Sequence, residues 1–295
     1  PGAPLRVLKR EALERLVSTL LAEGREVIGP TVREGAVRLA PIRSADDLPR
    51  GWTDAQGPGR YRLRREGDAI FDGWVVGPDS MKQTLFPSEE VLYRAERRAD
   101  GRVGFAPVTP AVTAKAFLGV RACDLAAAEQ QRAILEDGPW TDPRHAARRA
   151  DTFVIAVHCT TPGEPCFCAS TGTGPRVTGG ADLAIAERGD ELLVEAGTDA
   201  GRALLDRLDG TAATEADEAW LDDAMARARD AMGREVKTEG LPAALFARLD
   251  HPRWDEVADR CLACGNCTSV CPTCFCTTTE DRSSLDGSEA ERARL

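Results

Sequence analysis

The stretch Ala116-Phe-Leu-Gly-Val-Arg-Ala-Cys-Asp124 (AFLGVRACD) joins a short apolar strand to the beginning of a helix. The helical pattern runs from Leu125 to about Glu136, and an aspartate directly before it is a residue type that caps helix N-termini well. A second apolar strand, Thr152–Val157, follows. Because continuously apolar strands separated by helical segments are typical of parallel pairs with both faces covered, we expect an α/β sheet here.

Length and composition limit the function classes. The chain has 295 residues, 42% of them hydrophobic, and a net charge of −10. Its longest apolar stretches, such as Phe153–Val157, are far shorter than the ~18 residues of a transmembrane helix, so no membrane span is expected. Acidic and basic residues are interleaved, which argues against nucleic-acid binding. No hydrophobic signal segment precedes the first helical pattern at Lys9–Glu23, and we therefore expect a reducing, cytoplasmic location.

Six of the ten cysteines lie in one run, Cys261–Cys276 (CLACGNCTSVCPTCFC). Its first part has the spacing C-x2-C-x2-C-x3-C-P, which bacterial ferredoxins use to ligate a [4Fe–4S] cluster; its four cysteines are Cys261, Cys264, Cys267 and Cys271. Gaps of two residues let a tight loop present three thiolates to one cube, and Gly265 permits the backbone torsions of such a loop. A zinc ribbon is the alternative, but it needs a longer gap between two C-x2-C pairs.

The fourth ligand of this cluster is left open by the spacing alone. In ferredoxins with two clusters, the cysteine before the proline serves the other cluster. Either Cys271, Cys274 or Cys276 completes a single cluster, or a second motif lies beyond Leu295. We favour the second reading, in which the chain continues and Ser288 begins a helix.

The four remaining cysteines predict a second site. Cys123 and Cys159 each follow the carboxyl end of a predicted apolar strand, and Cys166 and Cys168 lie in the loop after them. If the strands are parallel neighbours, these thiols meet at the sheet edge where open α/β sheets bind ligands, and the helix dipole favours a thiolate at Cys123. Four thiols would suffice for a second [4Fe–4S] cluster. The alternatives are inert buried cysteines or a dithiol exchange pair.

Other polar residues add little catalytic chemistry. His158 could donate to a cluster sulfur or be a hydrogen-bonded core histidine, and Lys82 could approach an anionic cluster or remain a surface lysine. The Gly-rich Ser170–Pro175 lacks the order of a phosphate-binding loop, and we expect a turn. The sequence contains no Ser/His/Asp set, no paired-carboxylate signal and no dinucleotide fingerprint. We therefore expect electron transfer and no catalytic residue.

Together these patterns predict three regions. Residues 1–210 are expected to form an α/β (α+β) domain with a mixed sheet and a cysteine-lined edge. Residues 211–255 are expected to form a helical linker, in which Ala216, Trp220, Ala224, Ala228 and Met232 make a stripe that faces the core or a partner. Residues 256–295 are expected to form a ferredoxin-like [4Fe–4S] domain that is incomplete in this chain.

Three segments in this order resemble the β subunit of cytoplasmic NAD(P)-linked [NiFe] sulfhydrogenases: Gly119–Asp124 (GVRACD), Cys166–Pro175 (CFCASTGTGP) and Cys261–Cys276. The A subunit of anaerobic sulfite reductase is related in pattern. The similarity runs from about Lys82 to Cys276, and the CPTCFC ending is its most specific part. It implies an iron–sulfur subunit that passes electrons between a flavin- and NAD(P)-binding subunit and the [NiFe] hydrogenase small and large subunits.

The resemblance also implies cluster ligation by Cys261, Cys264, Cys267 and Cys271, and a second such run further downstream. The first hypothesis is therefore an electron relay in a hydrogenase complex. The same relay serving an anaerobic sulfite reductase is the second hypothesis. The third, from another class, is a zinc-stabilised scaffold or a redox-sensing protein.

Overall fold

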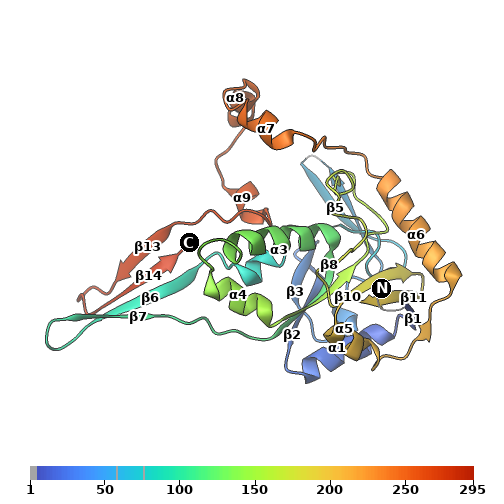
Figure 1. Ribbon diagram of the computed structural model, residues 1–295, viewed down its shortest axis with the longest axis horizontal. Coiled ribbons are helices and arrows are strands. Elements are labelled where there is room, and N and C mark those ends of the chain that lie inside the picture. The colour runs from blue at the N-terminus through green and yellow to red at the C-terminus, as the bar shows by residue number, and fades with distance from the viewer. Residues whose placement is uncertain (1–4, 58, 76) are drawn as a thin grey trace.

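A computed structural model describes residues 5–57, 59–75 and 77–295 (Figure 1). Its main sheet has eight strands in the order β12-β1-β11-β10-β9-β8-β2-β3. They are β1 (Arg6–Lys9), β2 (Glu26–Arg33), β3 (Ala36–Pro41), β8 (Lys115–Arg121), β9 (Thr152–Val157), β10 (Leu183–Arg188), β11 (Glu191–Ala196) and β12 (Thr211–Ala212). The pairs β2–β8, β8–β9 and β9–β10 are parallel and the others antiparallel, which confirms the predicted mixed sheet.

Helices cover both faces of this sheet. They include α1 (Ala12–Ala22), α2 (Lys82–Leu85), α3 (Ala122–Leu135), α4 (Pro143–Ala150), α5 (Asp199–Leu205) and α6 (Glu215–Asp230), with a 3-10 turn at Ala45–Asp47. Residues of β8 alternate between the two cores. Ala116 and Leu118 pack in the cluster that contains the apolar face of α1, whereas Phe117 and Val120 pack in the cluster that contains Leu125 of α3. The period of two in the strand therefore serves two separate layers.

Gly119 breaks this alternation inside β8. The register with β9 shifts between Leu118 and Val120, and Gly119 has a φ of +86°. A Cβ at this position would lie 3.0 Å from Cδ of Pro30. Glycine is therefore needed for both its backbone freedom and its small size.

The start of α3 differs from expectation. Arg121 is the N-cap residue and the helix begins at Ala122, so the prediction that Asp124 caps it is wrong. Asp124 lies in the first turn, where burial raises its pKa to about 6. The last residue of β8 thus passes directly into the helix, and Cys123 lies in its first turn.

A second sheet of four strands lies at one end of the molecule, in the order β13-β14-β6-β7. Its strands are β6 (Glu90–Arg97), β7 (Val103–Pro107), β13 (Thr279–Ser283) and β14 (Glu289–Arg294). The expectation of a helix from Ser288 is wrong, because an Asp286-Gly287 turn with Gly287 at φ +67° closes a hairpin that pairs with the edge of β6. Figure 1 shows this long sheet extending away from the main one.

The remaining elements are short. β4 (Trp52–Gly57) and β5 (Arg60–Arg65) form a two-stranded sheet, and α7 (Leu241–Phe246), α8 (Arg253–Ala258) and α9 (Asn266–Val270) follow α6. In Figure 1, α7 and α8 stand apart from the body of the molecule, and the chain then returns to α9 beside α3. Among the described residues, no helix has the length and apolar character needed to cross a membrane.

Candidate functional site

The parallel pairing of β8 with β9 places two cysteines at one sheet edge. Arg121 and Val157 are register partners at the carboxyl ends of these strands, and Cys123 and Cys159 each come two residues later. The prediction that the strands are parallel neighbours is confirmed. Because the two strands end at the same level, Cys123 and Cys159 follow them at the same edge of the sheet.

The loop that connects β9 to β10 brings the other two cysteines to this edge. The N–H of Cys159 donates to the carbonyl of Pro175 at 3.1 Å, and the N–H of Thr173 donates to the carbonyl of Cys168 at 3.0 Å, so the loop folds back on itself. A cavity of about 400 Å³ results, and its lining includes all four upstream cysteines: Cys123, Cys159, Cys166 and Cys168. The predicted turn at Ser170–Pro175 lies beside the cysteines, and Thr171, Thr173 and Pro175 line the same cavity.

Burial makes the thiols of Cys123, Cys159 and Cys168 hard to ionise. The side chain of Cys123 faces the open cavity and is exposed, yet surrounding protein atoms, Asp124 and the other three thiols raise its pKa, which outweighs the helix dipole expected to favour the thiolate. Burial raises the pKa of Cys168 to about 11 and also raises the pKa of Cys159. Four thiols that line one cavity suit a cationic iron centre, because soft thiolates are the ligands that iron–sulfur clusters select.

Arg121 forms a buried wall beside these cysteines. Its guanidinium stacks on the ring of Trp74 at 4.5 Å and donates to the carbonyl oxygens of Phe71 and Trp74. The positive charge partly offsets the effect of burial on Cys159 by lowering its pKa. The cavity therefore has one fixed cation at its wall, as expected for a site that holds anionic thiolates.

In the described ranges, no group of three or more His, Cys, Asp or Glu side chains is arranged to hold a metal ion. The upstream cysteines share a cavity without converging on one point. Assembly of a cluster would therefore draw the thiols inward, which is the usual coupling between metal binding and local folding. The ligand assignments remain predictions.

His158 is a core histidine. Its side chain is 0% exposed, its Nε2 lies 3.1 Å from Oε1 of Glu195, and its Nδ1 accepts the N–H of Val177 at 3.1 Å. Both ring nitrogens are thus occupied, and the alternative in which His158 donates to a cluster sulfur is wrong. The histidine instead fixes the loop that follows the cysteines.

The C-terminal cysteine run forms an exposed loop around α9. Gly265 has a φ of +70° and Ala263 a φ of +50°, so two left-handed residues turn the chain between its first cysteines. The N–H of Ala263 donates to Sγ of Cys261 at 3.3 Å. Backbone N–H groups that point at cysteine sulfurs are what a [4Fe–4S] loop requires, and four cysteines of the run are exposed: Cys261, Cys264, Cys267 and Cys276.

The thiol of Cys271 has a pKa below that of an ordinary cysteine. Its Sγ lies 3.2 Å from Oγ1 of Thr273, and this hydrogen bond, with a further one from Cys274, lowers its pKa to about 7. The hydrogen bond between Cys271 and Cys274 raises the pKa of Cys274, and the positive charge of Lys82 partly counteracts this increase. Lys82 therefore lies near the cysteines, as expected from the alternative in which it approaches an anionic cluster.

Two side chains of the α/β domain contact the C-terminal run directly. Nζ of Lys82 donates to the carbonyl of Cys271 at 3.0 Å, and Nε2 of Gln131 in α3 donates to the carbonyl of Pro272 at 2.8 Å. Pro272 and Thr273 also line the cavity of the upstream cysteines. The two candidate cluster sites therefore share a wall.

Met232 was missed as a site residue. Its Sδ lies 3.9 Å from Sγ of Cys168, and it lines the cavity. The available signal was its place at the end of the apolar stripe from Ala216, whose members Ala224 and Ala228 are buried in the core. Ala216 is exposed, the stripe faces the core from Trp220 to Ala228, and it reaches the cysteines only beyond the end of the helix.

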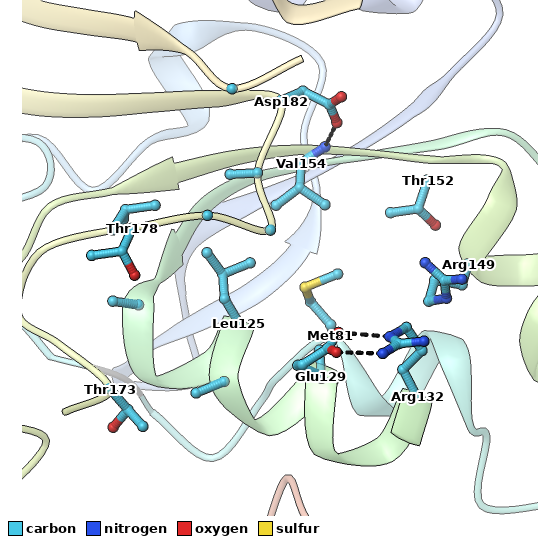
Figure 2. A pocket seen from close by; sticks show the side chains of 18 of the residues that line it. Met81, Leu125, Glu129, Arg132, Arg149, Thr152, Val154, Thr173, Thr178 and Asp182 are labelled. Carbon is cyan, nitrogen blue, oxygen red and sulfur yellow. Dashed lines mark hydrogen bonds and ion pairs between the residues drawn. The ribbon is translucent and has the colours of Figure 1, made fainter. Parts of the chain in front are cut away.

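A larger hollow of about 510 Å³ adjoins this cavity and shares Ala122, Ala126 and Thr173 with it. Figure 2 shows its apolar floor, with Leu125 and Val154, and its charged rim. The rim charges are paired, since Arg132 binds Glu129 and Asp182 accepts the N–H of Val154. The hollow exists because the crossover from β9 to β10 is a cysteine-bearing loop rather than a helix that would cover the sheet.

Residues 260–295 match the family model described as a 4Fe-4S dicluster domain, so this is an iron–sulfur protein. Over 260 residues, or 87% of this chain and 68% of the relative, it is 28% identical to Sulfhydrogenase 2 subunit beta of Pyrococcus furiosus. The resemblance drawn from the cysteine motifs is thus confirmed.

A solved structure was also found. A chain of the F420-reducing [NiFe] hydrogenase complex from Methanosarcina barkeri, studied by xenon derivatization, aligns with a TM-score of 0.41 and 10% sequence identity. The alignment covers 78% of the present chain and 90% of that chain.

Proposed function

We propose that this chain is a non-catalytic electron-relay subunit of a hydrogenase-type oxidoreductase complex. One [4Fe–4S] cluster would be held by Cys261, Cys264, Cys267 and Cys271, with Cys274 and Cys276 close by. A second would be held by Cys123, Cys159, Cys166 and Cys168. The observation that carries this proposal is the wall of Pro272 and Thr273 that the two cysteine groups share.

Short separation is what a relay needs, because electron tunnelling weakens steeply with distance. The protein would contribute thiolate ligands, backbone donors and a low-dielectric surrounding, which together set the potential of each centre. The bound clusters supply one-electron chemistry, and no bond-making residue is required of the chain itself.

The proposed partners are a flavin- and NAD(P)-binding subunit and the small and large subunits of a [NiFe] hydrogenase, in the cytoplasm. The name of the Pyrococcus relative supports the hydrogenase setting. A further support is a set of exposed apolar side chains on and around α7 and α8: Leu245, Phe246, Leu249, Trp254, Val257 and Leu262. Large exposed apolar groups of this kind mark surfaces that partner proteins cover.

The first experiment measures iron and acid-labile sulfide per chain in anaerobically purified protein, with electron paramagnetic resonance after dithionite reduction. The two sites require about eight irons with matching sulfide, on the stoichiometry of four-iron clusters. Cys168→Ser should lower the iron content by about four, and Ser170→Ala should leave it unchanged. Zinc without sulfide would support the scaffold or sensor hypothesis and refute the relay.

The second experiment tests the electron path in the assembled complex. Cys264→Ser should abolish electron transfer between NAD(P)H and the active site of the partner, while dye-linked activity of that partner remains. Undiminished transfer in this variant would remove the C-terminal cluster from the pathway. Ser269→Ala, on the same loop, is the matched control.

A further inference from the structure

We infer that Lys82 and Gln131 form a latch that holds the C-terminal cysteine loop against the cavity of the upstream cysteines. Both are positioning residues: they touch the loop through its backbone and would ligate nothing. The inference rests on the proposed function, because a latch between the two sites matters only if both sites hold redox centres.

Lys82 extends from a well-anchored base. It begins α2, where its neighbour Met81 and the helix residue Leu85 are 5% and 1% exposed, respectively. From there Nζ reaches the carbonyl of Cys271 at 3.0 Å and the carbonyl of Thr268 at 3.4 Å. One ammonium group thus binds the middle residue of α9 and the first residue after the helix.

Gln131 holds the loop from a second element. Its side chain is buried in α3, and its amide nitrogen donates to the carbonyl of Pro272 at 2.8 Å. A buried amide donor without a partner is strongly disfavoured. The carbonyl of Pro272 therefore stabilises Gln131 in α3, and Gln131 in turn fixes the position of the loop. Dislodging the loop would leave this donor unpaired.

The two contacts act on consecutive carbonyls, those of Cys271 and Pro272. Because they come from different elements, α2 and α3, they fix both the place and the direction of the chain at this point. Pro272 and Thr273 are thereby kept at the cavity, while Oγ1 of Thr273 stays 3.2 Å from Sγ of Cys271. The thiol of Cys271 is therefore in contact with Thr273, a residue of the wall that the two sites share.

The test compares Lys82→Met and Gln131→Met with Lys237→Met, which removes an exposed lysine. On the reduced holoprotein, electron paramagnetic resonance should show loss of the spin–spin interaction between the two centres in both latch variants. Hydrogen exchange of residues 268–276 should accelerate on the order of tenfold, as expected for a local segment that loses one anchor. Iron content should stay at the wild-type value.

Lys82→Arg provides the conservative rescue, since a guanidinium can donate to the same two carbonyls, and it should restore both signals. Unchanged exchange and unchanged spin–spin interaction in Lys82→Met would overturn the latch and leave the relay intact. Loss of iron in Lys82→Met but not in Lys237→Met would also overturn it, because the lysine would then serve cluster assembly. A wild-type protein with iron at only one site would refute the two-centre relay itself.

Discussion

The sulfur atoms of Met232 and Cys168 lie 3.9 Å apart, although the two residues are 64 positions apart in the sequence. Met232 follows the end of α6, and Cys168 lies in the crossover between β9 and β10. The thioether is apolar and polarisable, so it shields the thiol from water without offering it a hydrogen-bond donor. A side chain placed in this way would tune the centre held by Cys168.

Met232→Ala is expected to raise the reduction potential of the upstream cluster. Water admitted beside Cys168 would stabilise the reduced state, which is the more negative one. The reduction potential should therefore rise by on the order of 50 mV, a small part of the range that such clusters span. A redox titration followed by electron paramagnetic resonance measures the shift. Met225→Leu, in the buried core of α6, should leave the potential unchanged. A shift of equal size in that variant would attribute the effect to α6 as a whole.

Cysteine alkylation in the iron-free chain should depend on pH in a residue-specific order. Only the thiolate reacts, and the pKa is about 7 for Cys271 and about 11 for Cys168. Raising the pH from 6 to 8 should increase the rate at Cys271 about tenfold, whereas at pH 8 only about one part in a thousand of Cys168 is ionised. Peptide mapping after iodoacetamide treatment measures both rates.

Thr273→Val is the control for this order. It removes the hydrogen bond that lowers the pKa of Cys271, so reactivity of Cys271 at pH 7 should fall while Cys168 is unaffected. Equal reactivity of Cys271 in both proteins would show that Thr273 does not set its acidity.

Gly174→Ala is expected to disrupt the upstream site. A Cβ at Gly174 would lie 2.8 Å from Sγ of Cys168, closer than van der Waals contact allows. Iron per chain should fall by about four, the content of one cluster. Gly179→Ala is the matched substitution, since its Cβ meets nothing within 4 Å, and it should keep full iron content. Full occupancy in Gly174→Ala would mean that Cys168 is not a ligand.

Glu187→Ala is expected to destabilise the fold by about 3 kcal/mol, the usual cost of removing a buried charged acceptor. Its carboxylate, 2% exposed, accepts the N–H groups of Ile70 and Phe71 and lies 3.6 Å from Arg10. Chemical denaturation of the wild type and the variant measures the difference in the free energy of unfolding.

Glu129→Ala removes a carboxylate whose side chain is 62% exposed, and it should change stability by less than about 0.5 kcal/mol. Because the carbonyl of Phe71 accepts from Arg121, loss of Glu187 should also loosen the wall of the cysteine cavity. Equal free energies of unfolding for Glu187→Ala and Glu129→Ala would contradict the role of Glu187 in holding the segment that contains Ile70 and Phe71.

The sequence predicted those features that depend on neighbouring residues. Apolar runs identified β8 and β9, and a sheet edge at their carboxyl ends followed from the rule for parallel strands. The prediction for Ser288 failed because charge and alanine content there favour a helix locally, whereas a free edge on β6 and the turn at Gly287 make it a strand. Edge pairing with residues almost two hundred positions earlier leaves no local pattern.

The sequence by itself determined the chemistry of this protein. Spacing within Cys261–Cys271 decides which thiols one loop can present, because reach along a short backbone depends only on the number of intervening residues. Only the tertiary structure decided that Pro272 and Thr273 form a wall of the upstream cavity, and that Lys82 and Gln131 hold them there. Those contacts join residues brought together by packing of the sheet and its helices, and such packing depends on the whole core rather than on any one segment.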